Sequence, residues 1–247
     1  MGIFSKFKDF QKNRSESRHT KAVATLKNAK AIKEDRWAAI DFFSSMDDVE
    51  IAVPALLQRF EYSLEHGIND TREKEACMEG ITQHGDKVLP LVKEHLKSTT
   101  RIAWPIKIIR KLGSPESVVD CLKDALNYGE VAFDRSQVDK NYDILCHLIE
   151  YKLPGEATKL AHFLKDQDER VRYASAEVLI EQDDSVVPEI LEPFLVDLSP
   201  DNSRIRQAVL TAFVTKKWKI SDPKRYPDGR VAEGVTISKQ GTVEARV

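Results

Sequence analysis

Two segments of this sequence match each other at an offset of 34 residues, and this repeat limits the fold more than any other feature. DERVRYASAEVL (168–179) corresponds to NSRIRQAVLTAF (202–213), and the match extends into the segments before them. The matching pairs are Pro154 with Pro188, Leu160 with Phe194, Leu164 with Leu198, Val171 with Ile205, Ala174 with Ala208 and Leu179 with Phe213. An offset held over two helix-sized segments indicates a repeat of two helices.

In each predicted unit the second helix begins after an Asp-rich turn. The turns at 166–168 and 201–202 supply Asp or Asn side chains, which cap helix N-termini well. Upstream, the same alternation of helices and turns continues, but the residue pattern matches less closely. It predicts helices over residues 35–46, 49–65, 71–81, 86–96, 101–112, 115–126 and 137–151, with a turn at 69–70. Residues 37–215 would then form about five units, at the ~34–40 residue periods of helical repeats.

The order of residue types in the two best-matching units resembles that of a known repeat family. The order Asp, then Val-Arg-x-Ala, then Leu is similar to HEAT repeats and, more loosely, to the HEAT-like repeats of phycobilisome lyases. Tetratricopeptide repeats share the period, but their Trp-Leu-Gly-Tyr spelling is absent here. As a whole, the chain also resembles small uncharacterised bacterial HEAT-repeat proteins, notably around RIAWPIKIIRKL (101–112). The resemblance implies an all-α, HEAT-like α-solenoid, a superhelix of helix pairs, and brings no catalytic residues with it.

The repeated alanines and arginines have a structural interpretation. We expect Ala174 and Ala208 to pack inward, because alanine allows two helices to approach closely. Arg172 and Arg206 would lie at the edge of that core. There they would reach an acidic turn residue or carbonyl groups of a neighbouring unit, as the resemblance to HEAT repeats implies.

The helical pattern stops after Thr215. Prolines and an Asp-Gly pair within 223–229 mark a loop, and GVTISKQGTVEA (234–245) then alternates apolar residues around a turn. This predicts a short C-terminal β-hairpin, with 230–232 as a candidate third strand; an irregular tail is the alternative. Because a lone hairpin is marginal in water, we expect it to dock on the last repeat as a cap.

Charge divides the chain into three parts. Residues 1–36 hold ten Lys/Arg against four Asp/Glu (+6), residues 37–215 hold twenty against thirty-two (−12), and residues 216–230 hold six against two (+4). Nucleic-acid binding needs a positive surface, so the acidic middle argues against it. The predicted organisation is a basic amphipathic N-terminal cap (1–36), a repeat solenoid (37–215) and a C-terminal tail (216–247).

An enzyme with a HEAT-like fold would show catalytic or metal-binding residue patterns in its sequence. The di-iron enzyme deoxyhypusine hydroxylase uses repeated His-Glu pairs, but none of the six histidines here is followed by Glu. Trp37 and Asp41 lie one helical turn apart and keep a DNA glycosylase as an alternative, although we expect Trp37 in the core. A bilin lyase is the other enzyme alternative, through the repeat resemblance. Motifs for phosphate-binding loops and nucleophile elbows are absent, so we expect no catalysis, metal or cofactor.

Two stretches are candidate binding surfaces. On the predicted helix 101–112, Arg101, Trp104, Ile108 and Lys111 share a face, and an aromatic side chain flanked by cations is typical of interface hot spots. The alternative is that Trp104 packs against another repeat.

The second stretch is the N-terminal segment GIFSKFKDFQKNR. Phe4, Phe7 and Phe10 supply apolar side chains and Lys6 and Lys8 supply positive charge. Such a helix suits a cap on the first repeat, a membrane surface or an acidic groove. We favour the cap, because a solenoid needs one.

These observations predict a non-catalytic adaptor that binds a protein or peptide. A peripheral membrane adaptor that uses residues 1–14 is a further alternative. The three cysteines are odd in number and form no C-x-x-C pair, which favours free thiols in a reducing compartment. The start of the chain lacks a signal-peptide pattern, and no apolar run reaches the ~18 residues that span a bilayer. We therefore expect a cytoplasmic protein.

Overall fold

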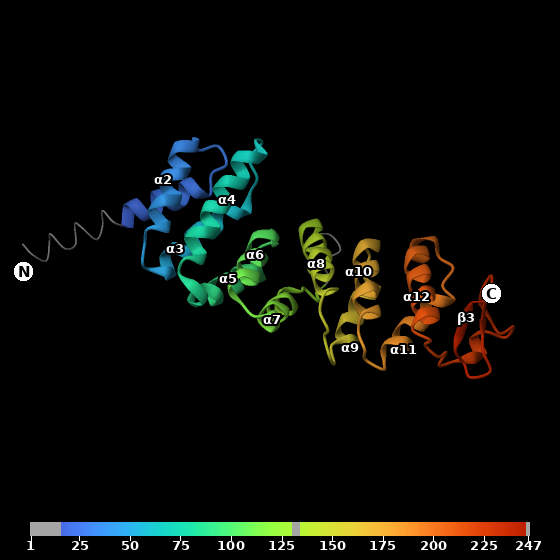
Figure 1. Ribbon diagram of the computed structural model, residues 1–247. Coiled ribbons are helices and arrows are strands. Elements are labelled where there is room, and N and C mark those ends of the chain that lie inside the picture. The colour runs from blue at the N-terminus through green and yellow to red at the C-terminus, as the bar shows by residue number, and fades with distance from the viewer. Residues whose placement is uncertain (1–15, 130–133, 246–247) are drawn as a thin grey trace, which may run out of the picture. The chain divides into compact units, whose positions relative to one another are not determined.

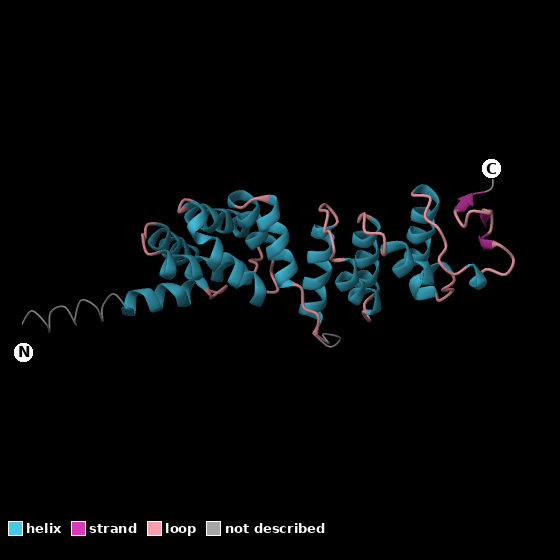
Figure 2. Ribbon diagram, turned by 90° about the horizontal axis from the view of Figure 1, so that it is seen from below, coloured by secondary structure: helices cyan, strands magenta, loops and turns pink. Residues whose placement is uncertain are grey.

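The computed structural model describes residues 16–129 and 134–245. Within these ranges the chain is mainly helical, as predicted (Figure 1), and strands occur only in the C-terminal segment (Figure 2). The chain divides into two compact units, Met1–Ala125 and Leu126–Val247, which are described separately. This division falls inside the predicted repeat region 37–215.

In the first unit, residues 16–26 are helical, and six helices and two 3-10 turns follow. They are α2 (Lys33–Ser44), α3 (Val49–Leu57), η1 (Gln58–Glu61), α4 (Gly67–Thr82), η2 (Gly85–Val88), α5 (Leu89–Ser98), α6 (Ala103–Leu112) and α7 (Pro115–Ala125). Helix α6 begins two residues before Pro105, so the proline lies in the first turn, where its missing N–H costs no helical hydrogen bond. The Asp48 side chain caps α3 by accepting a hydrogen bond from the Glu50 backbone N–H.

Contacts in the first unit arrange these helices in two rows. Helix α4 contacts α2 and α6, whereas α5 contacts α3 and α7. Between the rows, α3 contacts α2 and α4, and α6 contacts α5 and α7. The contact between α2 and α4 is close at Gly80, where an added Cβ would lie 2.1 Å from the Ser44 Oγ atom. A glycine inside a helix is normally unfavourable. Here it lets the two helices approach.

In the second unit, long helices alternate with short ones that continue as 3-10 turns. The elements are α8 (Arg135–Leu148), α9 (Ala157–Leu160), η3 (Ala161–Lys165), α10 (Glu169–Ile180), α11 (Val187–Leu191), η4 (Glu192–Leu195), η5 (Pro200–Asn202) and α12 (Ser203–Thr215). Helices α8, α10 and α12 lie side by side (Figure 1), and α10 contacts both of the others. The short elements pack on this row, η3 on α10 and η4 on α12.

The predicted register of the two best repeat units is confirmed at three of four core positions. Val171 and Ile205 are fully buried and Ala174 is 2% exposed. The prediction for Ala208 was wrong, because this residue is only half-buried. The reason is that Ala208 lines an open groove between α10 and α12.

Arg172 joins the turns of two successive repeat units, which confirms the prediction for this residue. Its guanidinium donates to the backbone carbonyl oxygens of Asp166 (3.0 Å) and Gln167 (2.9 Å) in its own turn. It also donates to the Asn202 Oδ1 atom (3.0 Å) and the Asp201 carbonyl oxygen (3.2 Å) in the next turn. Within the described residues, Arg206 is half-buried and makes no corresponding hydrogen bond.

Asn202 has a different role from the one its position predicts. Asp168 caps α10, accepting a hydrogen bond from the Arg170 backbone N–H, as expected. Asn202 precedes α12, but its side chain does not cap that helix. Its Oδ1 atom accepts from Arg172 and its Nδ2 atom donates to Asp197, so it holds the turn instead.

The C-terminal segment forms a three-stranded antiparallel sheet, which confirms the predicted hairpin and its third strand. The strands are β1 (Arg230–Ala232), β2 (Val235–Ile237) and β3 (Val243–Ala245), in the order β1-β2-β3. Strand β3 contacts α12, and Val243 is 1% exposed. The Trp218 ring meets Phe213 of α12 edge-on, with centroids 5.3 Å apart. The sheet therefore docks on the last helix as a cap.

Hydrogen bonds to a buried carboxylate hold this cap against the helices. Glu192 of η4 is 1% exposed, and it accepts hydrogen bonds from the Ser221 backbone N–H (2.7 Å), the Ser221 hydroxyl and the Asp222 backbone N–H (3.3 Å). These bonds tie the segment before the sheet to the last pair of helical elements.

Two local predictions in the first unit were wrong. Residues 69–70 do not form a turn, since α4 begins at Gly67 and Asp70 lies in its first turn. The Asp70 Oδ1 atom accepts a hydrogen bond from the Leu64 backbone N–H (3.0 Å), which ties the preceding loop to the helix. Trp37 is half-buried rather than a core residue, because Ile40 and Phe43 form the buried face of α2.

We expect the two repeat alanines to respond differently to enlargement. Ala174→Leu should lower the free energy of unfolding by about 1–3 kcal/mol, because extra methyl groups in a packed core force neighbours apart. Ala208→Leu should cost clearly less, since the new side chain can enter the groove beside it. Urea unfolding followed by circular dichroism measures both; equal losses for the two variants would contradict the register described here.

Candidate functional site

The surface predicted on α6 is only partly available to a partner. Ile108 is fully buried, so its assignment to a binding face was wrong; it packs in the core because α6 turns this side toward the rest of the unit. Trp104 is half-buried and stacks on Phe60 of η1, with ring centroids 5.7 Å apart and an interplanar angle of 6°. The Lys107 ammonium lies 4.2 Å from the Trp104 ring centroid on this helix.

The two predicted cations of this surface are exposed. The Arg101 guanidinium lies 3.4 Å from the Ser63 hydroxyl, and the Lys111 ammonium donates to the Thr82 hydroxyl at 3.1 Å. With Ile108 buried and Trp104 stacked, the four residues do not form one apolar anchor. The docking residues predicted near the N-terminus, Phe4, Lys6, Phe7, Lys8 and Phe10, lie outside the described residues.

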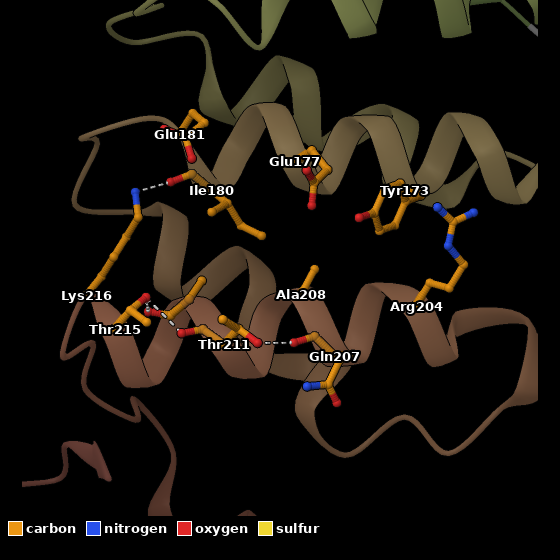
Figure 3. Close-up of a pocket in the computed structure, with 11 residues that line it drawn as sticks. Tyr173, Glu177, Ile180, Glu181, Arg204, Gln207, Ala208, Thr211, Thr215 and Lys216 are labelled. Atoms are coloured by element: carbon orange, nitrogen blue, oxygen red, sulfur yellow. Dashed lines mark hydrogen bonds between the residues drawn. The ribbon is translucent and has the colours of Figure 1, made fainter. Parts of the chain in front are cut away.

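The second unit carries an open groove between α10 and α12, with a volume of about 530 Å³ (Figure 3). Tyr173 and Glu177 line it from α10, and Glu181 lines it from the position directly after that helix. From α12, Arg204 lies at one end and Ala208 points into the space between the helices. The small side chain of Ala208 leaves this volume unfilled.

Aromatic rings and arginines alternate beside the groove. The Arg170 guanidinium lies 5.3 Å from the Tyr142 ring centroid, and the Arg204 guanidinium lies 4.2 Å from that of Tyr173. All four side chains line a smaller pocket of about 110 Å³, together with Cys146. Each arginine stacks on a tyrosine of the preceding long helix, so the row α8, α10 and α12 carries a Tyr-Arg ladder.

The two arginines of the ladder differ in their partners. Arg170 forms ion pairs with Asp139 (2.7 Å) and Asp168 (2.8 Å), and the hydrogen bond to Asp168 is the main cause that raises its pKa. Arg204 is exposed and, among the described residues, forms no ion pair with a carboxylate. Its guanidinium therefore has donors available for an incoming group.

Two other titratable groups beside the groove, Cys146 and Tyr173, have raised pKa values. Burial raises the pKa of the Cys146 thiol, which lowers the fraction of reactive thiolate. Burial and a hydrogen bond with Glu177 raise the pKa of Tyr173, so its phenol remains protonated. The lining of the larger groove contains no histidine, cysteine or aspartate. It offers ion pairing, aromatic stacking and apolar contact.

The first unit contains a cluster of buried charges, here called the Glu73 cluster. Glu73 is fully buried and accepts from Arg36 through two bonds of 2.9 Å and from Arg59 at 2.8 Å. Arg59 also donates to Asp70 (2.7 Å), and Asp70 pairs with Lys74 (2.7 Å). Three cations and two carboxylates link α2, η1 and α4. We interpret this cluster as structural, because Arg36, Arg59, Glu73 and Lys74 are all at most 6% exposed.

Sequence reasoning missed both the groove and the Glu73 cluster. The only local signal for the cluster was the Asp70–Lys74 spacing of four residues on one helix. For the groove, the signal was the recurrence of a tyrosine on one long helix and an arginine on the next, in Tyr142 with Arg170 and Tyr173 with Arg204.

Across residues 16–129 and 134–245, no three His, Cys, Asp or Glu side chains are grouped as a metal site would require. In the same ranges, no helix has both the length and the apolar character needed to cross a bilayer. Neither a protein-family model, nor a curated protein, nor a solved structure matches the chain.

Proposed function

We propose that this chain is a HEAT-like repeat protein that acts as a non-catalytic adaptor and binds a protein or peptide partner. The groove between α10 and α12 is the binding surface, in place of the face predicted on α6. Three features support the repeat assignment: the 34-residue offset, the row of long helices, and the link that Arg172 makes between successive turns.

One observation carries the binding proposal. Arg204 stacks on Tyr173 at the end of an open groove and, within the described residues, lacks a carboxylate partner. Arginine and tyrosine are enriched among the residues that dominate binding energy at protein interfaces. A guanidinium held in place by an aromatic ring loses little side-chain entropy when a partner binds.

We place this adaptor in the cytoplasm. Cys77, Cys121 and Cys146 are all free thiols, and free thiols persist in reducing compartments.

A groove-filling variant tests the proposed function. Ala208→Phe should place an aromatic ring in the groove and reduce capture of the partner at least about tenfold, a loss of ~1.4 kcal/mol in binding free energy. The measurement is affinity capture from lysate of the organism that encodes the chain, with quantitative mass spectrometry.

Ala38→Phe is the matched control, because Ala38 is an exposed alanine on α2 in the other unit. Proteins retained by the wild type and by Ala38→Phe, but lost with Ala208→Phe, are groove partners. If Ala208→Phe retains the same captured proteins as the wild type, the groove is not the binding surface.

A further inference from the structure

Charge in the second unit changes sign at the groove. Residues 134–201 hold seven Lys/Arg against sixteen Asp/Glu, a net charge of −9. Residues 202–230 hold eight against two, a net charge of +6. Helix α10 lies in the acidic part and α12 in the basic part. Helix α10 itself holds two Glu and two Arg, so the sign of its groove wall depends on the residues that line the groove.

The residues that line the groove follow this division. Glu177 and Glu181 lie on the α10 side, while Arg204 and Lys216 lie on the α12 side at opposite ends of the groove (Figure 3). Helix α12 contains no acidic residue. Lys216 reaches the Ile180 carbonyl oxygen, at the end of α10, and does not pair with either glutamate.

The backbone of the groove walls limits the conformation of an occupant. Both walls are helices, whose N–H and C=O groups already bond within each helix, so an extended peptide would find no strand edge to pair with. A helix satisfies its own backbone hydrogen bonds. From Tyr173 to Glu181 the α10 wall extends about 12 Å, roughly two helical turns.

Given the proposed function, we infer that the partner is an amphipathic helix with opposite charges along its two edges. Its apolar face lies over Ala208, Ala212 and Ile180. Its basic edge faces Glu177 and Glu181, and its acidic edge faces α12, with one carboxylate on Arg204. A carboxylate accepts two hydrogen bonds from a guanidinium, which fixes the register of the helix along the groove.

Three labelled helical peptides test this inference. They have about 16 residues and the same leucine stripe, and differ only at the edges: one edge Glu and one Lys, both edges Lys, or both edges Glu. Fluorescence anisotropy at low salt measures binding to the full chain. The mixed-edge peptide should bind at least about tenfold more tightly than either of the others.

Charge changes in the groove provide the decisive comparison. Glu177→Lys/Glu181→Lys makes both walls basic, so it should weaken the mixed-edge peptide about tenfold and favour the all-Glu peptide. These lysines lie at the C-terminal end of α10, where positive charge is favourable to the helix. When Arg204→Glu and Thr211→Glu are added to this double variant, the α10 wall is basic and the α12 wall gains two acids, the reverse of the wild-type arrangement. The mixed-edge peptide should then bind again, because turning a helix end for end exchanges its edges.

The outcomes separate this inference from the proposed function. Equal affinities for the three peptides, or a folded four-residue variant that does not regain the mixed-edge peptide, would overturn the opposite-edge helix. So would a failure of all three peptides to bind. None of these results bears on the capture experiment with Ala208→Phe, which judges the groove itself.

Discussion

Glu73→Gln is expected to lower the free energy of unfolding by about 3–5 kcal/mol, the usual cost of breaking a buried ion pair by removing one partner. Glu73 is fully buried and bonds both Arg36 and Arg59. The substitution leaves these two buried guanidinium groups facing a neutral amide, where burial limits their solvation. The Glu73 cluster would then hold three cations against the single carboxylate of Asp70.

The companion variant Arg59→Met should cost less than Glu73→Gln. It leaves two cations, Arg36 and Lys74, and two carboxylates, Asp70 and Glu73, so the remaining charges balance. Glu75→Gln is the matched control, because Glu75 is exposed on the same helix. Denaturant unfolding at neutral pH measures all three variants. A loss from Arg59→Met that equals or exceeds the loss from Glu73→Gln would contradict this account of the charges.

Glu73→Gln should also change how the free energy of unfolding depends on pH. Burial would raise the pKa of Glu73, but hydrogen bonds from Arg36 and Arg59 outweigh it and hold that pKa below its ordinary value. A carboxyl whose pKa is lowered by folding stabilises the folded state above its unfolded pKa, about 4.3 for Glu, and loses this contribution as the pH falls through the folded pKa. Glu73→Gln should therefore unfold with a shallower dependence on pH in that acidic range.

Glu192→Ala is expected to loosen the C-terminal cap and to cost about 1–3 kcal/mol, because the donors of Ser221 and Asp222 lose their acceptor. Proteolysis between 216 and 245 should accelerate, and Trp218 fluorescence should shift as its contact with Phe213 weakens.

Two controls accompany this prediction. Glu192→Gln should be milder, because an amide retains one accepting oxygen. Glu189→Ala removes an exposed acid from the adjacent α11 and should leave the cap intact. If Glu189→Ala and Glu192→Ala give the same proteolysis rate, the buried carboxylate does not hold the cap.

Features that depend on residue spacing and helix caps within a short segment could be predicted from the sequence. The helix after Asp168, the buried positions Val171 and Ala174 and the hairpin around Gly241 all follow from short-range pattern, and the structure confirms them. Even the contact of Arg172 with the next turn followed from the repeat, because a 34-residue offset places equivalent turns side by side.

The Glu73 cluster could not be predicted from short-range patterns. Glu73 and Lys74 lie in a segment rich in charged residues, TREKEACMEGI, that is typical of a solvated helix. Their burial depends on Arg36, 37 residues before Glu73, and on Arg59, 14 residues before it. No spacing rule within one helix reports a partner at that separation.

The groove was missed for the opposite reason. Ala208 aligns with Ala174, so the repeat predicts the same packing at both positions. Ala174 of α10 is 2% exposed, whereas Ala208 of α12 lines the groove that faces α10. Whether such an alanine is covered depends on the side chains opposite it on the neighbouring helix, which the repeat pattern does not encode.

The shared carboxylate of the Glu73 cluster also restricts how this sequence can change over evolutionary time. Losing Glu73 first leaves buried Arg36 without a carboxylate partner and leaves Asp70 as the one carboxylate for Arg59 and Lys74, so we expect selection against that intermediate. Losing Arg59 first leaves a balanced set, from which later substitutions are tolerated. Descendants of this chain should therefore include forms with Glu73 and one arginine, but not forms with both arginines and no acid at 73.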